Sequence, residues 1–306
     1  MAFTLRQLKY FVTAAELGQI SQAGVQLNIS QSAITTAVRD LEAFLGNTLF
    51  DRTSSGVVLT PMGRRFLSHA YEVLDAADRA MAMPNQESTI SGRVKVAVTP
   101  TVMGYFLPTH LQRVGQLHPK LQVEIEELTR PAIEEALVRG QVDVGLLLTD
   151  NIQRTGDINS EVFFGSPMRV WMATGHELAS GNSTDMKDVA RHPLIMLNSD
   201  EAEEAAMRNW RHFGLEPSVV LRTSSIEAVR SMAANGVGVA VLPDMIYRPW
   251  SLEGRRIETR PIEDDLPPMN VGMAWNKAGT PSAVATAFMD YFRHFFFSPN
   301  SGNSAW

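Results

Sequence analysis

The stretch that decides the fold runs from residue 4 to residue 63. It opens with Thr4-Leu-Arg-Gln-Leu-Lys-Tyr-Phe-Val12, continues with Ile20-Ser-Gln-Ala-Gly-Val-Gln-Leu-Asn-Ile-Ser-Gln-Ser-Ala-Ile-Thr-Thr-Ala-Val-Arg-Asp-Leu-Glu42, and closes with Leu49-Phe-Asp-Arg-Thr53 and Leu59-Thr-Pro-Met-Gly63. Apolar residues recur at helical spacing within residues 5–15, 20–27 and 33–45. The pattern predicts three short helices that share one core.

The break between the second and third predicted helices is Asn28-Ile29-Ser30. Asn suits a turn, and Ser30 is a good N-cap for a helix that begins at Gln31. A helix that enters the major groove of DNA with its N-terminus first must present short polar side chains there. We therefore expect four side chains to face base edges: Gln31, Ser32, Thr35 and Thr36.

This segment resembles the DNA-binding domain of LysR-type transcriptional regulators, through the helix pair and the ordered motifs Leu49-Phe-x-Arg52 and Leu59-Thr-Pro-x-Gly63. The resemblance implies a winged helix-turn-helix that binds operator DNA. Phosphate and minor-groove contacts are then expected from Ser21, Arg39, Arg52 and Arg64. The sequence departs from the family pattern at Ser32, where Pro is frequent, at Thr36, where Arg or Lys is common, and in the wing stretch Thr53-Ser-Ser-Gly56, which lacks the basic residue often found there. Fewer cationic contacts to DNA follow. The alternative is a three-helix core with an accidental turn signature.

Length and composition bound the remaining possibilities. With 306 residues, the chain is long enough for two or more domains. No apolar run approaches the roughly 18 to 20 residues of a membrane helix, and the N-terminus lacks a basic segment followed by an apolar one, so a cytoplasmic protein is expected. The absence of cysteine excludes disulfides, thiolate catalysis and redox sensing through thiols.

The net charge of -6 is unusual for a protein that binds DNA, but it is unevenly distributed. Residues 1–66 carry six basic and four acidic side chains, a balance of +2. Such a module should bind phosphate weakly and should depend on a second copy for affinity. A homodimer or homotetramer is therefore expected.

A further helix is predicted from Pro61 to about Met83. Apolar residues at three-and-four spacing form one stripe along it: Phe66, Leu67, Ala70, Val73, Leu74, Ala77 and Met81. The stripe could pack back on the preceding domain or pair with a second chain, and the resemblance favours pairing. The polar stretch from Pro84 to Gly92 is typical of a linker and hinge.

From Arg93 onward, short apolar runs alternate with helical patterns, which predicts doubly wound α/β sheets and a second set of elements of the same build. This region resembles the two-lobed effector-binding domain of the same regulators, which is similar to periplasmic binding proteins. The expected organisation is a winged helix-turn-helix over residues 1–60, a dimerisation helix and hinge over 61–90, and an effector-binding domain over 91–306. Lobe I is expected at about 91–163 plus 268–297, and lobe II at about 164–267.

Ligands of open parallel sheets bind beyond the carboxyl ends of the strands. Hydroxyl side chains follow several predicted strands, and the family resemblance points to four of them as effector contacts: Thr99, Thr101, Thr129 and Thr149. Val102, Met196 and Ser224 are further candidates, and Met103 and Phe106 are candidate apolar partners. Each hydroxyl could equally be an ordinary N-cap or turn residue. Hydroxyls near helix N-termini suit an anionic group, so a small organic anion is expected between the lobes.

The sequence contains no complete motif for a dinucleotide-binding or metal site. Gly236-Val-Gly238 lacks the third glycine of a dinucleotide-binding motif, and the seven histidines show no metal-ligand spacing. The aromatic group Tyr291, Phe292, Phe295, Phe296 and Phe297 favours packing over base stacking. We expect an effector-controlled regulator that is not an enzyme, needs no cofactor or metal, and works with operator DNA and RNA polymerase. A cytoplasmic solute-binding protein without DNA-binding function and an enzyme on the α/β region are the alternatives.

Overall fold

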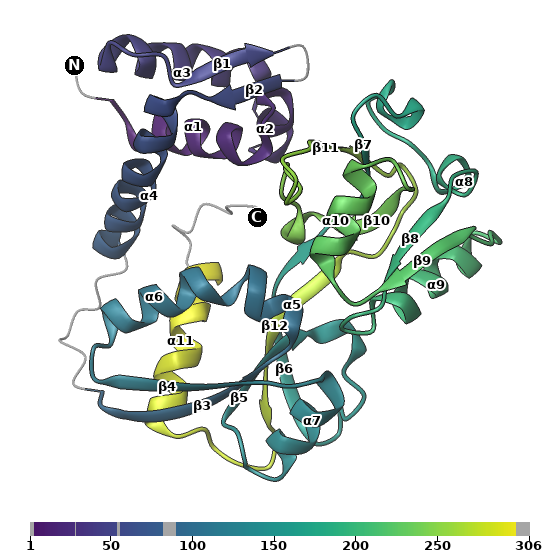
Figure 1. Cartoon of the computed structure of the whole chain (residues 1–306). Helices are drawn as coiled ribbons and strands as arrows, with labels where there is room; N and C mark the ends of the chain where they lie inside the picture. Colours follow the sequence, from purple (N-terminus) through teal and green to yellow (C-terminus); the bar gives the residue numbers. More distant parts are fainter. Residues whose placement is uncertain (1–2, 28, 54–55, 82–89, 298–306) are drawn as a thin grey trace. The chain divides into compact units, whose positions relative to one another are not determined.

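The computed structural model describes residues 3–27, 29–53, 56–81 and 90–297. The described residues divide into two compact units, one formed by residues up to 81 and the other by residues 90–297. The first unit holds the predicted helix-turn-helix, and the second holds the predicted α/β region (Figure 1).

The first unit is a winged helix-turn-helix, as predicted. Its elements are α1 (Leu5–Leu17), α2 (Ile20–Gln26), α3 (Gln31–Leu45), the antiparallel wing strands β1 (Phe50–Thr53) and β2 (Gly56–Leu59), and α4 (Pro61–Met81). The core includes Leu8, Phe11, Ile34, Val38, Leu41 and Leu49, each exposed by 4% or less. The predicted helical periodicity therefore places the apolar residues of three helices in one core. Asn28 and the wing tip at residues 54–55 lie outside the described residues.

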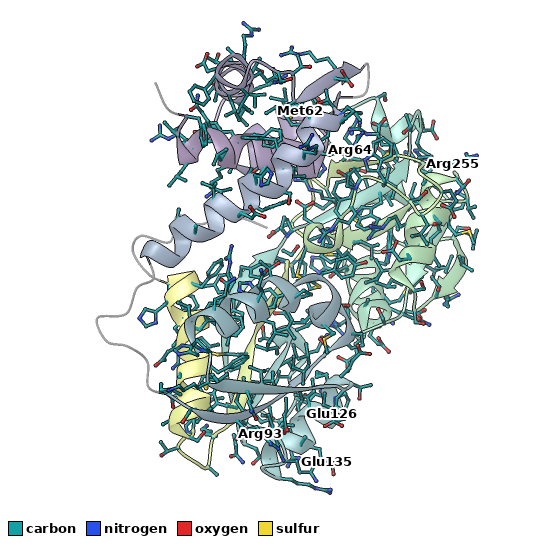
Figure 2. All side chains as sticks on the ribbon, turned by 60° about the vertical axis from the view of Figure 1, so that its left-hand side comes forward. Met62, Arg64, Arg93, Glu126, Glu135 and Arg255 are labelled. Atoms are coloured by element: carbon teal, nitrogen blue, oxygen red, sulfur yellow. The ribbon has the colours of Figure 1, made fainter. Side chains whose placement is uncertain are left out.

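Helix α4 packs one side against this core. Ala70 is buried, and Phe66, Leu67 and Leu74 lie against the same cluster. Tyr71 and Val73 are exposed by 43% and 38%. The apolar stripe is thus divided, since much of it packs back on the first unit while Val73 remains at the surface. Figure 2 shows Met62 and Arg64 on the first turn of this helix. The end predicted near Met83 and most of the predicted linker lie outside the described residues.

Lobe I of the second unit is built on a sheet with the strand order β4-β3-β5-β12-β6. Its elements are β3 (Gly92–Val98), α5 (Pro100–Tyr105), α6 (Leu107–Leu117), β4 (Leu121–Glu127), α7 (Arg130–Val138), β5 (Val144–Leu148), the 3-10 turn η1 (Thr149–Asn151), β6 (Ile158–Ser166), β12 (Met269–Asn276) and α11 (Ala283–Phe297). Figure 1 shows α6 and α11 on one side of this sheet and α7 on the other.

Lobe II is built on two smaller sheets, β10-β7-β11 and β8-β9. Its elements are β7 (Met168–Ala173), the 3-10 turn η2 (Glu177–Ala179), α8 (Met186–Val189), β8 (Leu194–Leu197), α9 (Ala202–His212), β9 (Val219–Thr223), α10 (Ile226–Ala234), β10 (Ala240–Pro243), the 3-10 turn η3 (Asp244–Ile246) and β11 (Ile257–Pro261). An isolated bridge between Leu194 and Val239 links the two sheets.

The prediction of doubly wound parallel sheets is wrong in part, because both lobes also contain antiparallel strand pairs. In lobe I, β3 is parallel to β4 and β5, but β12 is antiparallel to both β5 and β6. In lobe II, β7 pairs antiparallel with β10 and β11. The physical reason in lobe I is that β6 carries the chain toward lobe II and β12 carries it back, so adjacent strands run in opposite directions. Helix α5 and strands β6 and β11 were not expected from the sequence.

Candidate functional site

The helix-turn-helix is fixed by contacts at the start of α3. The Ser30 hydroxyl accepts the Ala33 backbone N–H at 3.2 Å and lies 3.0 Å from the Ser32 hydroxyl, so Ser30 is the predicted N-cap. In the turn, the Ile29 N–H donates to the Gly24 carbonyl at 2.9 Å. A Cβ atom on Gly24 would lie 2.9 Å from the Ile29 carbonyl oxygen, so the tight turn requires glycine.

The outer surface of α3 carries the residues predicted to face DNA. Ile34, Val38 and Leu41 are buried, and Gln31, Ser32, Thr36 and Arg39 are exposed. Thr35 is half-buried, and its hydroxyl donates to the Gln31 carbonyl at 2.9 Å. The structure therefore brings the predicted polar side chains together on one helix, although the Thr35 hydroxyl is committed to the helix backbone.

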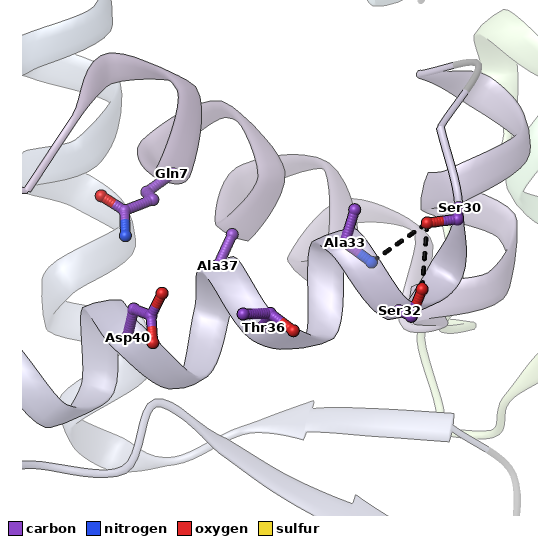
Figure 3. Close-up of a pocket in the computed structure, with 7 residues that line it drawn as sticks. All are labelled: Gln7, Ser30, Ser32, Ala33, Thr36, Ala37 and Asp40. Atoms are coloured by element: carbon purple, nitrogen blue, oxygen red, sulfur yellow. Dashed lines mark hydrogen bonds between the residues drawn. The ribbon is translucent and has the colours of Figure 1, made fainter.

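A shallow hollow of about 370 Å³ lies beside this polar surface. It is lined by Gln7, Ser30, Ser32, Ala33, Thr36, Ala37 and Asp40 (Figure 3). The Gln7 side-chain oxygen accepts both the backbone N–H and the hydroxyl of Thr4, so its NH₂ group is left as the donor. Gln7 and Asp40 were not predicted from the sequence, and Gln7 comes from α1, whose position beside α3 is set by the tertiary fold.

The wing is held against α3 and α4 by contacts that explain the family motifs. One oxygen of Glu42 accepts the backbone N–H groups of Leu49 and Phe50 at 2.7 and 3.1 Å. The Thr60 hydroxyl donates to the Thr48 carbonyl and accepts the Gly63 N–H, both at 2.8 Å. A Cβ atom on Gly63 would lie 2.1 Å from the Leu49 carbonyl oxygen, which leaves room only for glycine.

The other predicted phosphate contacts lie on different elements of the same unit. Ser21 on α2 and Arg52 on β1 are exposed. Arg64 on α4 is also exposed, and its guanidinium donates to the Leu59 carbonyl at 2.8 Å. The guanidinium of Arg64 is thereby oriented by the wing exit.

In the second unit, four of the predicted effector residues begin elements of lobe I. Thr99 occupies the N-cap position of α5, Thr101 lies in its first turn, Thr129 precedes α7 and Thr149 starts η1. Thr99 is exposed by only 2%, and within the described residues its hydroxyl has no hydrogen-bond partner. The Thr149 hydroxyl donates to the Asn270 carbonyl at 3.3 Å.

The remaining predicted effector residues differ in their surroundings. Val102 and Met196 are buried, and Met196 packs in the core of lobe II beneath α9. Ser224 is exposed. Phe106, expected as an apolar partner, stacks in the core of lobe I against Phe163 and Phe292. Of the C-terminal aromatic group, Tyr291, Phe292, Phe295 and Phe296 pack around Phe106 and His110, as predicted, whereas Phe297 is exposed by 49%.

Polar contacts cross between the lobes at Thr101 and Arg130. The Thr101 N–H donates to one Asp200 carboxylate oxygen at 2.7 Å. The Arg130 Nε atom lies 2.8 and 2.9 Å from the two carboxylate oxygens of Glu201, and one Arg130 Nη atom lies 2.6 Å from the same carboxylate. The hydrogen bonds to Glu201 raise the pKa of Arg130, whereas burial raises the pKa of Asp200.

Asp200 and Glu201 were missed by sequence reasoning. They follow the carboxyl end of strand β8, and ligands of open α/β sheets bind beyond the carboxyl ends of the strands. The ligand contacts expected after the strands were hydroxyls, whereas these two residues carry carboxylates. The preceding residue, Ser199, has a buried hydroxyl that has no hydrogen-bond partner within the described residues.

A second interlobe contact lies at Tyr105 on α5. Its hydroxyl lies 3.1 Å from a carboxylate oxygen of Glu227 and accepts a hydrogen bond from the Arg230 guanidinium at 3.2 Å. The Arg248 guanidinium carbon lies 5.4 Å from the centre of the Tyr105 ring. None of these residues was predicted as part of the site.

Two negative observations are limited to the described part of the chain. It contains no group of three or more His, Cys, Asp or Glu side chains that could hold a metal ion. None of its helices is both long enough and apolar enough to cross a membrane.

Two family models match the chain. The model described as "LysR substrate binding domain" matches residues 87–296, and the model described as "Bacterial regulatory helix-turn-helix protein, lysR family" matches residues 5–64. One match lies in each of the two compact units.

Similar proteins and structures agree with these matches. The helix-turn-helix transcriptional regulator YwqM of Bacillus subtilis is 27% identical over 295 residues, covering 95% of this chain and 99% of that protein. The dual regulator OxyR of Escherichia coli is 29% identical over 248 residues, covering 80% of each chain. The crystal structure of HinK, a LysR family regulator from Pseudomonas aeruginosa, has a TM-score of 0.63 and 27% identity, covering 96% of this chain and 98% of that one.

Proposed function

Because this chain belongs to the LysR family of DNA-binding transcriptional regulators, we propose that it binds a partly palindromic operator as a homodimer or homotetramer under the control of a small organic anion. Residues 1–60 supply the DNA-binding domain, 61–90 the dimerisation helix and hinge, and 91–306 the effector-binding domain. RNA polymerase is the proposed downstream partner. The observation that carries the proposal is a polar, exposed recognition surface on α3 in the same chain as a two-lobed domain with buried hydroxyls at its interlobe contacts.

Specificity comes from short polar side chains in this proposal. Gln31, Ser32 and Thr36 face base edges, with a smaller role for Thr35, whose hydroxyl bonds its own helix. Ser21, Arg39, Arg52 and Arg64 hold the DNA backbone or the minor groove. Because so few cations face DNA, each of them should account for a large share of the salt dependence.

The DNA proposal is tested with sites selected by the purified protein from random duplex DNA. Arg52→Ala should weaken binding to all sequences and lower the salt slope by about one, because one phosphate contact is lost. Gln31→Ala should relax specificity at one base pair, at a cost of about 1–3 kcal/mol. Lys120→Ala, at an exposed position of the second unit, is the control. Wild-type affinity, salt slope and selected sequence in both variants would show that the recognition surface is elsewhere.

The effector proposal places an anionic group near Thr99, Thr101, Thr129 and Thr149, with the buried Val102 and Met196 and the exposed Ser224 as further candidates. Support comes from the buried Thr99 hydroxyl and from the Arg130 guanidinium, which is exposed by 11% and already binds a carboxylate. Effector alters the DNA-bound state only if it binds one lobe arrangement more tightly than another. Operator DNA must then alter effector affinity by the same factor.

Thermal unfolding in the presence of a panel of small carboxylates tests this proposal. At least one carboxylate should raise the midpoint of the second unit, with chloride at equal ionic strength as the salt control. Thr101→Val should reduce that shift, because it removes a hydroxyl and keeps the branched shape. Thr109→Val on the exposed side of α6 should not reduce it. If no carboxylate raises the midpoint, the effector is not an organic anion of this kind.

A further inference from the structure

We propose that the turn Ser199-Asp200-Glu201 is an intramolecular competitor of the effector, which holds the lobes together until an external anion takes its place. We name these residues the acidic turn. The inference rests on the proposed anionic effector, and it adds the internal groups that this effector must displace.

The first observation is that both carboxylates of the acidic turn cross to lobe I. Asp200 accepts the Thr101 N–H at 2.7 Å. Glu201 forms a two-point ion pair with Arg130, whose side chain is exposed by 11% and that of Glu201 by 28%. An N–H group and a guanidinium are the donors that an external carboxylate would need. In this structure, carboxylates of the protein itself occupy both.

The second observation is the backbone conformation of the acidic turn. Asp200 and Glu201 have φ angles of 49° and 61°, and they are the non-glycine residues with positive φ in the described part of the chain. Two consecutive side-chain-bearing residues in this region cost free energy, so the surrounding contacts must hold them there. Loss of the contacts with Thr101 and Arg130 would allow the turn to relax.

The third observation is that Arg130 would stay in position without the acidic turn. Its guanidinium also pairs with Glu134, which is exposed by only 2%. Glu134 in turn accepts the backbone N–H groups of Gln153 and Arg154, at 3.2 and 2.8 Å. Arg130 is therefore oriented from within lobe I, and departure of Glu201 would present a preorganised guanidinium to a ligand.

The fourth observation concerns hydroxyls on both sides of this contact. The Thr99 hydroxyl in lobe I and the Ser199 hydroxyl in lobe II are buried and have no hydrogen-bond partner within the described residues. Buried hydroxyls are normally paired, so an additional polar partner is expected where these two residues lie. An anion that displaces Asp200 would supply acceptor oxygens for them.

Competition of this kind has a direct consequence for binding. The apparent dissociation constant of the effector rises by the inverse of the fraction of molecules in which the acidic turn is released. Removing the Asp200 carboxylate should therefore strengthen the binding of an external carboxylate. If Asp200 instead helped to bind the effector, its removal should weaken that binding.

The test uses the full chain and compares the wild type with Asp200→Ala and Asp200→Asn in titrations with sodium acetate, succinate and benzoate. The asparagine variant keeps the side-chain size and tolerates a positive φ, so it guards against a folding defect in the alanine variant. Glu203→Gln is the matched control, because Glu203 lies next to the acidic turn but pairs with Arg222 of the same lobe at 2.7 Å.

We expect at least about fivefold tighter binding of a carboxylate to one or both Asp200 variants, and unchanged binding to Glu203→Gln. Equal or weaker binding in both Asp200 variants would overturn the inference and leave the anionic effector standing. If none of the three carboxylates binds any of the proteins, the anionic effector and the inference that rests on it are both rejected.

A measurement without ligand tests the same contacts. The chain contains no cysteine, so Gln141→Cys in lobe I and Glu216→Cys in lobe II can carry the only two spin labels of each chain, both at exposed positions. Asp200→Ala should lengthen or broaden the distance distribution between the labels, and Glu203→Gln should not. An unchanged distribution in Asp200→Ala would overturn the proposed role of the acidic turn in holding the lobes.

Discussion

His110 shows how burial controls the chemistry of a single residue. It has no exposed surface, its Nδ1 atom lies 2.8 Å from the Tyr291 hydroxyl, and its ring contacts Phe106 and Phe292. Burial, assisted by the nearby charge of Arg113, lowers the pKa of His110 to about 3. In the sequence, His110 cannot be distinguished from the other six histidines, because burial is a property of the folded chain.

The lowered pKa of His110 predicts a loss of stability in acid. An unfolded His binds a proton near its ordinary pKa of about 6.5 whereas the folded residue does not, so stability is full above that pH and falls as pH decreases toward 3. The free energy of unfolding of the second unit should fall by about 2 kcal/mol between pH 7 and pH 5 from this residue. Urea titrations should show that His110→Gln removes this contribution and Tyr291→Phe retains it. Equal pH dependence in His110→Gln and the wild type would contradict the assignment.

At the scale of elements, the Leu59-Thr-Pro-Met-Gly63 motif is explained by how the wing meets α4. Thr60 caps the helix and bonds Thr48, and Gly63 allows the helix to touch the Leu49 carbonyl. The motif could be recognised in the sequence, but the close approach that requires Gly63 could not, because it joins residues 14 positions apart in the folded unit.

Gly63→Ala should destabilise the first unit by about 1–3 kcal/mol, because the new Cβ atom would meet backbone rather than a flexible side chain. Gly115→Ala in α6 is the matched control. Its Cβ atom would meet nothing within 4 Å, so the substitution should be neutral or stabilise by up to about 1 kcal/mol. Thermal unfolding followed by circular dichroism measures both. Similar midpoints for the two variants would contradict the close approach at Gly63.

At the scale of the whole molecule, the weak charge of the DNA-binding module makes self-association part of the DNA-binding argument. Residues 1–66 carry a balance of only +2. Two linked modules bind two half-sites far more tightly than one module binds one. In α4, Ala70 and its apolar neighbours pack on the first unit, so the exposed Tyr71 and Val73 are the candidates for contact with a second copy.

Val73→Glu should therefore weaken self-association, because it places a charge within an apolar contact. The dissociation constant from sedimentation equilibrium should rise at least about tenfold, and affinity for a two-half-site operator should fall with it. Ser68→Glu, at another exposed position of α4, should leave both unchanged. If Val73→Glu assembles like the wild type, α4 does not associate through this surface.

The cysteine-free composition also separates this chain from a thiol-based response. Three similar proteins are named hydrogen peroxide-inducible genes activators, yet the 306 residues here contain no cysteine to oxidise. Similarity in fold therefore does not transfer the signal. The proposed control by a ligand rests instead on the interlobe contacts of the acidic turn.

The sequence by itself determined the helix-turn-helix, the wing motifs and the alternation of strands and helices in the second unit. These features depend on local periodicity and capping, which neighbouring residues encode. Only the tertiary structure decided that β12 returns antiparallel into lobe I, that Asp200 and Glu201 bind Thr101 and Arg130 across the lobes, and that Met196 and Phe106 are held in cores. Those contacts join residues that lie far apart in the sequence, some by more than a hundred positions. A local sequence pattern does not specify which distant group a side chain will contact. The helix-turn-helix could thus be predicted from residues 4–63, whereas the Asp200 and Glu201 contacts on which the proposed competition rests appear only in the folded chain.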